Sequence, residues 1–216
     1  MGKLWTPAFA LSLILTTAAQ DRSAVPASLV AAAQRPLIQF AAALARAGLP
    51  AGLEFREGDE GLSDVRVPSP SGAPVSLQDV ARAFEKHHAA YRAVVMGKVL
   101  VMRPRSNRRD YLDEPSHIDA PTKVTGIMAA SRRVFAPGWP ALLHDVIANS
   151  YGTPGEDVEV VLDGRGRKVV DMLNEIVLQV PKHVWLVSTT RGRLTTFGFL
   201  DAKGLRRTGL LPVDSR

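Results

Sequence analysis

The chain contains no cysteine at all among its 216 residues. Disulfides, thiolate nucleophiles and cysteine metal sites are therefore excluded, and the folded chain must rely on a hydrophobic core. Aromatic residues are scarce as well, at 6% of the sequence, and only five histidines could supply a metal ligand or an acid–base group. These absences narrow the candidate chemistries before any motif is considered.

Long apolar runs are missing except at the N-terminus. Residues 8–15 form such a run, after a lone Lys3 and before the small residues 17–19. This pattern predicts a secretory signal peptide over residues 1–19, with a mature chain that begins near Gln20. The run is shorter than the roughly 20 apolar residues of a membrane helix, and no cysteine follows it for a lipid anchor. We therefore expect a periplasmic or secreted bacterial protein with no stable membrane span after signal cleavage.

Charge of one sign is not concentrated anywhere in the chain, although the formal net charge is +6. The densest basic cluster lies between two proline-flanked segments and has no interleaved aromatic residue. Its members are Arg103, Arg105, Arg108 and Arg109. Such a cluster is more typical of a solvated linker than of a nucleic-acid surface, so we expect no nucleic-acid partner.

The clearest structural signal lies in residues 167–200. Apolar residues recur there at helical spacing: Val169, Leu173, Ile176 and Val180. Polar residues occupy the other side in this interpretation: Asp171, Asn174, Glu175 and Gln179. Pro181 should end the helix near Val180, and alternating residues around the turn at 190–193 then predict a β-hairpin. We expect Trp185 and Phe197 of this hairpin to face the helix.

The first half of the chain repeats this order. A helix is expected over about 35–48, a strand over 53–56, and a second helix after a capping box at Ser76. Two strands, 91–96 and 98–103, then flank Gly97. The two halves align as a divergent repeat in which Tyr91 falls opposite Trp185.

The sequence therefore predicts an α+β protein made of two small units, each ending in a helix and then a β-hairpin. The expected boundaries are a first unit at 20–104, a linker at 105–116, a second unit at 117–200 and a C-terminal tail at 201–216. Within the second unit we expect a strand at 124–128, a helix at 139–149 and a strand at 158–162. Whether the units form a repeat or one continuous domain is left open.

The first unit contains the segments RPLIQFAAALARAGLPAGLEF and PVSLQDVARAFEKHHAAYRAVVMGKVLVMRP. Over about residues 30–104 these resemble the short N-terminal domain of secretins and TonB-dependent receptors, the STN-like domain. The helix–hairpin pattern extends the resemblance to 117–200. That family's domain binds other proteins and performs no catalysis, so the resemblance implies a periplasmic interaction module. No secretin core or receptor barrel follows within these 216 residues.

The polar residues offer three weak candidate sites. Adjacent His87 and His88 point about 100° apart on a helix and so do not form a metal pair. His144 and Asp145 could act as a base and its orienting acid, but no serine lies in a Gly-x-Ser-x-Gly context. The glycine turn at 163–168 lacks the spacing of a P-loop. We therefore predict no catalytic, cofactor-binding or metal-ligating residue and no cofactor.

Three functional hypotheses remain. The leading one is an exported, non-enzymatic protein–protein interaction module of the bacterial cell envelope, with an unidentified envelope protein as its partner. The alternative is a glycan or small-ligand binding module that uses Trp139, Tyr151 and Trp185. The second alternative is a hydrolase that uses His144 and Asp145.

Overall fold

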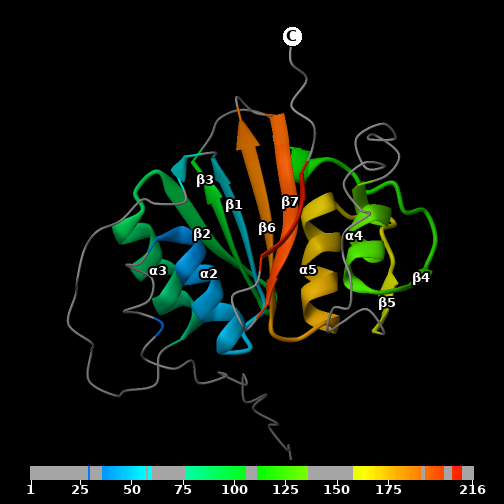
Figure 1. Ribbon diagram of the computed structural model, residues 1–216, viewed down its shortest axis with the longest axis horizontal. Coiled ribbons are helices and arrows are strands. Elements are labelled where there is room, and N and C mark those ends of the chain that lie inside the picture. Colours follow the sequence, from blue (N-terminus) through cyan, green and yellow to red (C-terminus); the bar gives the residue numbers. More distant parts are fainter. Residues whose placement is uncertain are drawn as a thin grey trace, which may run out of the picture.

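The computed structural model describes Leu29 and residues 36–56, 58–59, 76–105, 111–135, 158–190, 193–201 and 206–210. The predicted signal peptide and the helix expected at 139–149 lie outside the described residues. The described part is a mixed α+β fold, as predicted, with a six-stranded sheet and a smaller two-stranded sheet. Helices lie on both faces of the larger sheet (Figure 1).

The helices are α2 (Leu37–Arg46), α3 (Leu77–His87), α4 (Ile127–Phe135) and α5 (Val169–Gln179), with a 3₁₀ turn η2 (Tyr111–Asp113). The strands are β1 (Ala51–Arg56), β2 (Tyr91–Met96), β3 (Val99–Pro104), β4 (Thr122–Thr125), β5 (Glu159–Leu162), β6 (His183–Thr190), β7 (Arg193–Asp201) and β8 (Arg206–Leu210). The large sheet has the order β2-β3-β1-β6-β7-β8, and β4 pairs with β5 in the small one.

Strand β1 joins the two halves of the chain. It runs parallel to β3 on one side and to β6 on the other, so the β2–β3 and β6–β7 hairpins belong to one sheet. The two helix–hairpin units therefore share a continuous sheet. Strand β8 lies in the stretch that the sequence assigned to the tail and pairs with β7. Residues 111–113 of the expected linker form η2, where Leu112 is buried.

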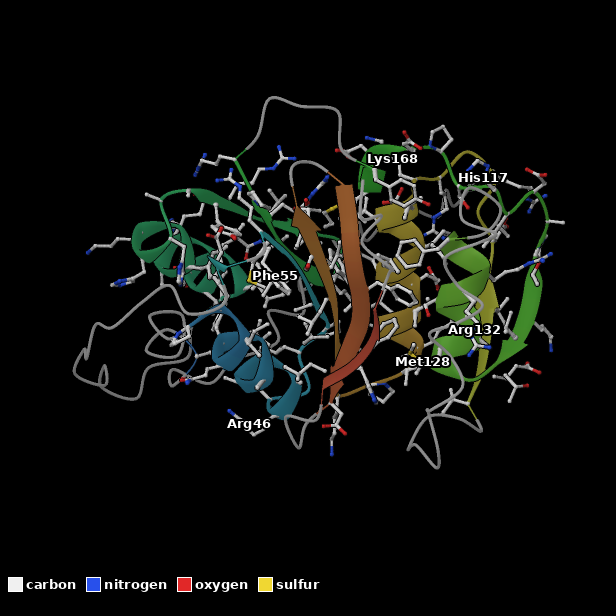
Figure 2. The ribbon with its side chains drawn as sticks, turned by 45° about the horizontal axis from the view of Figure 1, so that its top comes forward. Arg46, Phe55, His117, Met128, Arg132 and Lys168 are labelled. Atoms are coloured by element: carbon white, nitrogen blue, oxygen red, sulfur yellow. The ribbon has the colours of Figure 1, made fainter. Side chains whose placement is uncertain are left out.

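Side-chain alternation along the strands divides the interior into two cores. Helices α2 and α3 pack on one face of the sheet with Phe55, Val184 and Leu186, and Figure 2 shows Phe55 between these elements. Helices α4 and α5 pack on the other face with Trp185 and Val187. Successive residues of β6 thus enter opposite cores, as the period of a strand requires.

The predicted α5 helix and its hairpin are confirmed. Helix α5 ends at Gln179, and the amide of Val180 still bonds to the carbonyl of Ile176, at 2.9 Å. Helices α3 and α5 begin alike, because the amides of Ser76 and Lys168 each donate to an aspartate three residues later, at 2.9 Å in both cases. These aspartates are the third residues of their helices, where a carboxylate stabilises the N-terminus.

The strand predicted at 124–128 is wrong in its second half. Strand β4 ends at Thr125, and Gly126, with φ of 93°, turns the chain into helix α4. Only glycine adopts this backbone angle without strain. Ile127, Ala130 and Val134 then lie at helical spacing and contribute to the core beside α5.

Candidate interaction surface

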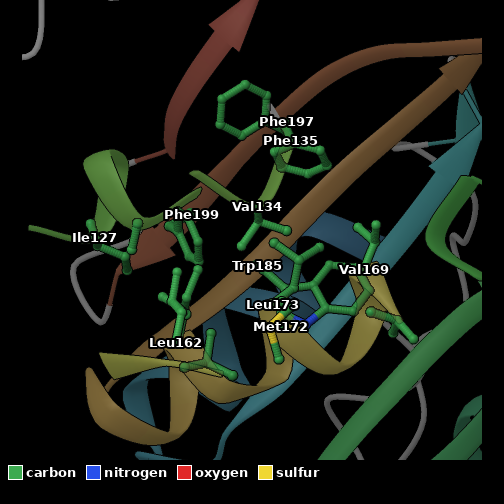
Figure 3. Close-up of a cluster of buried hydrophobic side chains, with 14 of the residues drawn as sticks. Ile127, Val134, Phe135, Leu162, Val169, Met172, Leu173, Trp185, Phe197 and Phe199 are labelled. Atoms are coloured by element: carbon green, nitrogen blue, oxygen red, sulfur yellow. The ribbon is translucent and has the colours of Figure 1, made fainter. Parts of the chain in front are cut away.

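The aromatic residues of the second hairpin lie in the core, as predicted. Trp185 is 1% exposed, and the ring of Phe197 packs at a tilt against that of Phe135 of α4, with 4.8 Å between the ring centroids. Figure 3 shows the Trp185 indole against Met172 and Leu173 of α5. An exposed binding platform at Trp185 is therefore excluded. Trp139 and Tyr151, the other aromatics of the ligand-binding alternative, lie outside the described residues.

Gly52 of β1 creates the space that the indole fills. It is the register partner of Trp185 in the parallel β1–β6 pair. A Cβ atom on Gly52 would lie 1.7 Å from Cε2 of Trp185, which no side-chain rearrangement within the same packing can accommodate. A glycine inside a strand commonly marks such a close approach. No prediction from the sequence included this pair, although a glycine inside the apolar stretch of β1 is a signal for it.

Asn174 corrects the predicted polar face of α5. It was assigned to the solvent side but is 6% exposed. Its Oδ1 accepts a hydrogen bond from Nε1 of Trp185 at 2.9 Å, and its Nδ2 lies 3.9 Å from Sδ of Met96. The buried indole N–H thus has the partner it requires, and α5 is linked to β2 through one amide side chain.

The histidines within the described residues do not form a metal site. No group of three or more histidine and carboxylate side chains gathers there at metal-binding distance. His88 is buried at the end of α3, and its ring lies 4.6 Å from that of Phe84. His183 is buried at the start of β6, where Nδ1 lies 3.0 Å from the carbonyl of Pro181. The candidate pair His144 and Asp145 lies outside the described residues.

The glycine turn before α5 is closed upon itself. Arg165 folds back onto Asp163 with N···O distances of 3.0 and 2.7 Å, and this hydrogen bonding lowers the pKa of the Asp163 carboxyl. The amide of Lys168 donates to Asp171, and the amide of Val169 donates to the carbonyl of Glu114. These two amides therefore have partners within the protein, which opposes the anion-cradle interpretation.

One member of the basic cluster, Arg103, is not solvated, which corrects the interpretation of the cluster as a solvated linker, whereas Arg105 is exposed but ion-paired. Arg103 is buried and pairs with Glu54 at 3.0 Å and with Asp113 at 3.0 Å. Although burial acts to raise the pKa of Asp113, the hydrogen bond and charge of Arg103 hold it below its usual value. This network ties β1 and β3 to η2.

The free edge of β2 is partly closed by side chains. Nε of Arg105 donates to the carbonyl of Tyr91 at 2.8 Å, and the amide of Ala93 donates to Oε1 of Glu85 at 2.7 Å. Arg105 and Glu85 also pair with each other, at 3.1 Å. Edge strands blocked in this way resist the addition of another strand.

The most exposed apolar surface lies beside this strand, on the face that α5 covers only in part. Helix α5 contacts β1 and β6. An open depression of about 480 Å³ remains between α5 and the β2–β3 turn, which we call the α5–β2 groove. The turn contributes Met96, Gly97, Lys98 and Val99, and the α5 side contributes Arg167, Asp171, Asn174 and Leu178.

Two large aliphatic side chains are exposed on this side of the molecule, one in the lining of the groove and one beside it on β2. Leu178 of α5 is 43% exposed, and Val94 of β2 is 48% exposed. Val94 precedes Met96 by two residues and therefore points to the same face of the strand. Exposed aliphatic residues beside a depression with a polar rim are typical of a protein-binding surface.

A search with family models, one against curated proteins and one against solved structures each found no match to this chain. In the part of the chain that the structure describes, no helix is long and apolar enough to cross a membrane.

Proposed function

We propose that this chain is an exported, non-enzymatic protein–protein interaction module of the bacterial cell envelope. The observation that carries the proposal is the α5–β2 groove together with the exposed strip of β2 beside it. Leu178 lines the groove, and Val94 is exposed next to it, on a sheet face that α5 covers only in part. A partner that covers this surface would remove both aliphatic side chains from water. Removal of apolar surface is the main favourable term in protein association.

The sequence supports the same proposal independently. The apolar run at residues 8–15 favours export to the periplasm or beyond the cell. The resemblance of residues 30–104 to the STN-like domain favours a module that binds proteins. The glycine turn at 163–168 is closed by Arg165 and Asp163, which opposes an anion-binding site there. Trp185 is buried, which opposes an exposed ligand-binding platform.

The proposal is tested by affinity capture from its bacterial host. A tagged full-length chain is expressed at native level, the periplasmic and medium fractions are collected, and native capture is followed by mass spectrometry. We expect the chain in one of these fractions, cleaved near Gln20, together with a reproducible envelope protein. A chain that keeps Met1 and stays in the cytoplasm, or repeated capture without an envelope protein, would contradict the proposal.

A further inference from the structure

Two unpaired cations lie along the apolar strip of β2. Arg92, Val94 and Met96 alternate onto one face of the strand, and Lys98 follows in the turn. Arg92 and Lys98 are exposed, and neither forms a salt bridge with any residue that the structure describes. The strip therefore has an apolar centre with a positive charge at each end.

We propose that the α5–β2 groove and the adjoining exposed face of β2 bind an acidic, apolar peptide segment of a partner protein. Carboxylates of the segment pair with Arg92 and Lys98, and an apolar side chain between them covers Val94 and Met96. The inference rests on the proposed function and adds the chemistry of the partner and the place where it binds.

The acidic groups of the opposite wall do not compensate these cations. The carboxylate of Asp171 accepts from the amide of Lys168 at 2.9 Å. Glu175 binds the guanidinium of Arg167 at 3.3 Å. Neither carboxylate forms a salt bridge with Arg92 or Lys98 in the part of the chain that the structure describes. The net charge of +6 also favours the approach of an acidic partner over that of a second copy of the chain.

The geometry restricts the shape of the segment. Arg92 and Met96 are four positions apart in the strand, about 13 Å, and Lys98 lies beyond Met96. The acidic residues must therefore be at least about four positions apart in an extended segment or at least about nine apart in a helix. The Glu85–Arg105 pair blocks the backbone edge of β2. The segment is therefore expected to bind through side chains on the face of the strand, without adding a strand to the sheet.

The test begins with a library of random linear peptides displayed on phage and selected against the immobilised full-length chain. We expect the enriched peptides to combine Asp or Glu with Leu, Ile or Phe. For a synthetic copy of one such peptide, Arg92→Glu and Lys98→Glu should each weaken binding about tenfold, and Val94→Asp by more. Lys86→Glu is the matched control, because Lys86 is exposed on α3 at the other face of the sheet, and it should change binding less than about twofold.

Several results would overturn the inference. One is enrichment of peptides without acidic residues, and another is equal binding by the Arg92→Glu, Lys98→Glu and Lys86→Glu variants. A concentration-dependent dimer in sedimentation that Val94→Asp abolishes would assign the groove to a second copy. Co-sedimentation with phosphatidylglycerol vesicles that Arg92→Glu abolishes would assign it to a membrane surface. If the Val94→Asp variant still captures the same envelope protein, the proposed binding surface is wrong, but the proposed interaction function stands.

Discussion

Replacement of Gly52 by alanine tests the packing between the two halves of the chain. Alanine ordinarily favours a strand over glycine by about 0.5–1 kcal/mol, because glycine loses more conformational freedom on folding. At position 52 we expect alanine to destabilise the folded protein instead. The new Cβ would lie 1.7 Å from Cε2 of Trp185, so the indole must leave its present position or β1 must separate from β6.

The expected loss of stability follows from two contributions. Overpacking of a close-packed core costs about 1–3 kcal/mol. Displacement of the indole also breaks its hydrogen bond to Asn174, which contributes about 1 kcal/mol. Gly52→Ala should therefore lower the free energy of unfolding by about 2–4 kcal/mol, which is a large part of the stability of an ordinary domain.

The assay is urea denaturation followed by far-ultraviolet circular dichroism, with Trp185→Ala as the second variant of a double-mutant cycle. Trp185→Ala alone should cost about 3–5 kcal/mol, and in that background the cost of Gly52→Ala should fall to about zero. If Trp185→Ala does not fold, Trp185→Leu serves as the background. A Gly52→Ala protein as stable as the parent, or additive costs in the double variant, would refute the packing described here.

Four further outcomes are expected. Arg103→Ala should destabilise the protein by about 3–5 kcal/mol in urea denaturation, because it leaves Glu54 buried without its cation, and adding Glu54→Gln should recover part of the loss. The folded-state pKa of Asp113 is lowered, so its contribution to stability is present above the unfolded-state pKa of about 3.9 and is lost as the pH falls below that value. Asp113→Asn should therefore weaken the loss of stability in acid that denaturation curves show. An unchanged loss would contradict the pairing of Asp113 with Arg103. Hydrogen peroxide should oxidise Met96, at the open groove, before the two fully buried methionines, and peptide mass spectrometry showing the reverse order would contradict an open groove. Brief trypsin treatment should cut first around Arg105 to Arg109, a polar stretch flanked by prolines, whereas initial cuts inside 169–199 would contradict the division into two units.

The sequence predicted best the elements whose apolar residues recur at a regular spacing within a short segment. The α5 helix and its hairpin could be predicted because apolar residues recur at helical and then at strand spacing, and Pro181 marks the boundary. Burial of Trp185 and Phe197 followed from the same pattern. These features depend on residues that are close together in the chain.

The features that were missed depend on partners far apart in the chain. Parallel pairing of β1 with both β3 and β6 joins residues about 50 and 130 positions away, and no local pattern specifies it. Arg103 was counted in a solvated basic cluster for this reason, since its carboxylate partner Glu54 is 49 positions away on another strand. Asn174 is an exception, because its partner Trp185 is only 11 positions away, but the amide and the indole meet only when β6 lies against α5.

The groove could not be predicted because it depends on where α5 lies over the sheet. The alternation in β2 places Arg92, Val94 and Met96 on one face, but the sequence does not indicate that α5 covers β1 and β6. The second wall of the groove, including Leu178, is therefore visible only in the folded chain.

Photo-crosslinking in the bacterial host tests the central claim most directly. A benzoylphenylalanine is introduced at Val94, beside the groove, or, as the control, at Val161 of β5, an exposed valine on the small sheet. After irradiation of intact cells, we expect one discrete adduct from position 94 that contains an envelope protein, with an acidic, apolar peptide at the crosslink, and no such adduct from position 161. Position 94 yielding no adduct, or the same products as position 161, would contradict the proposal that this exported chain binds a partner through the α5–β2 groove.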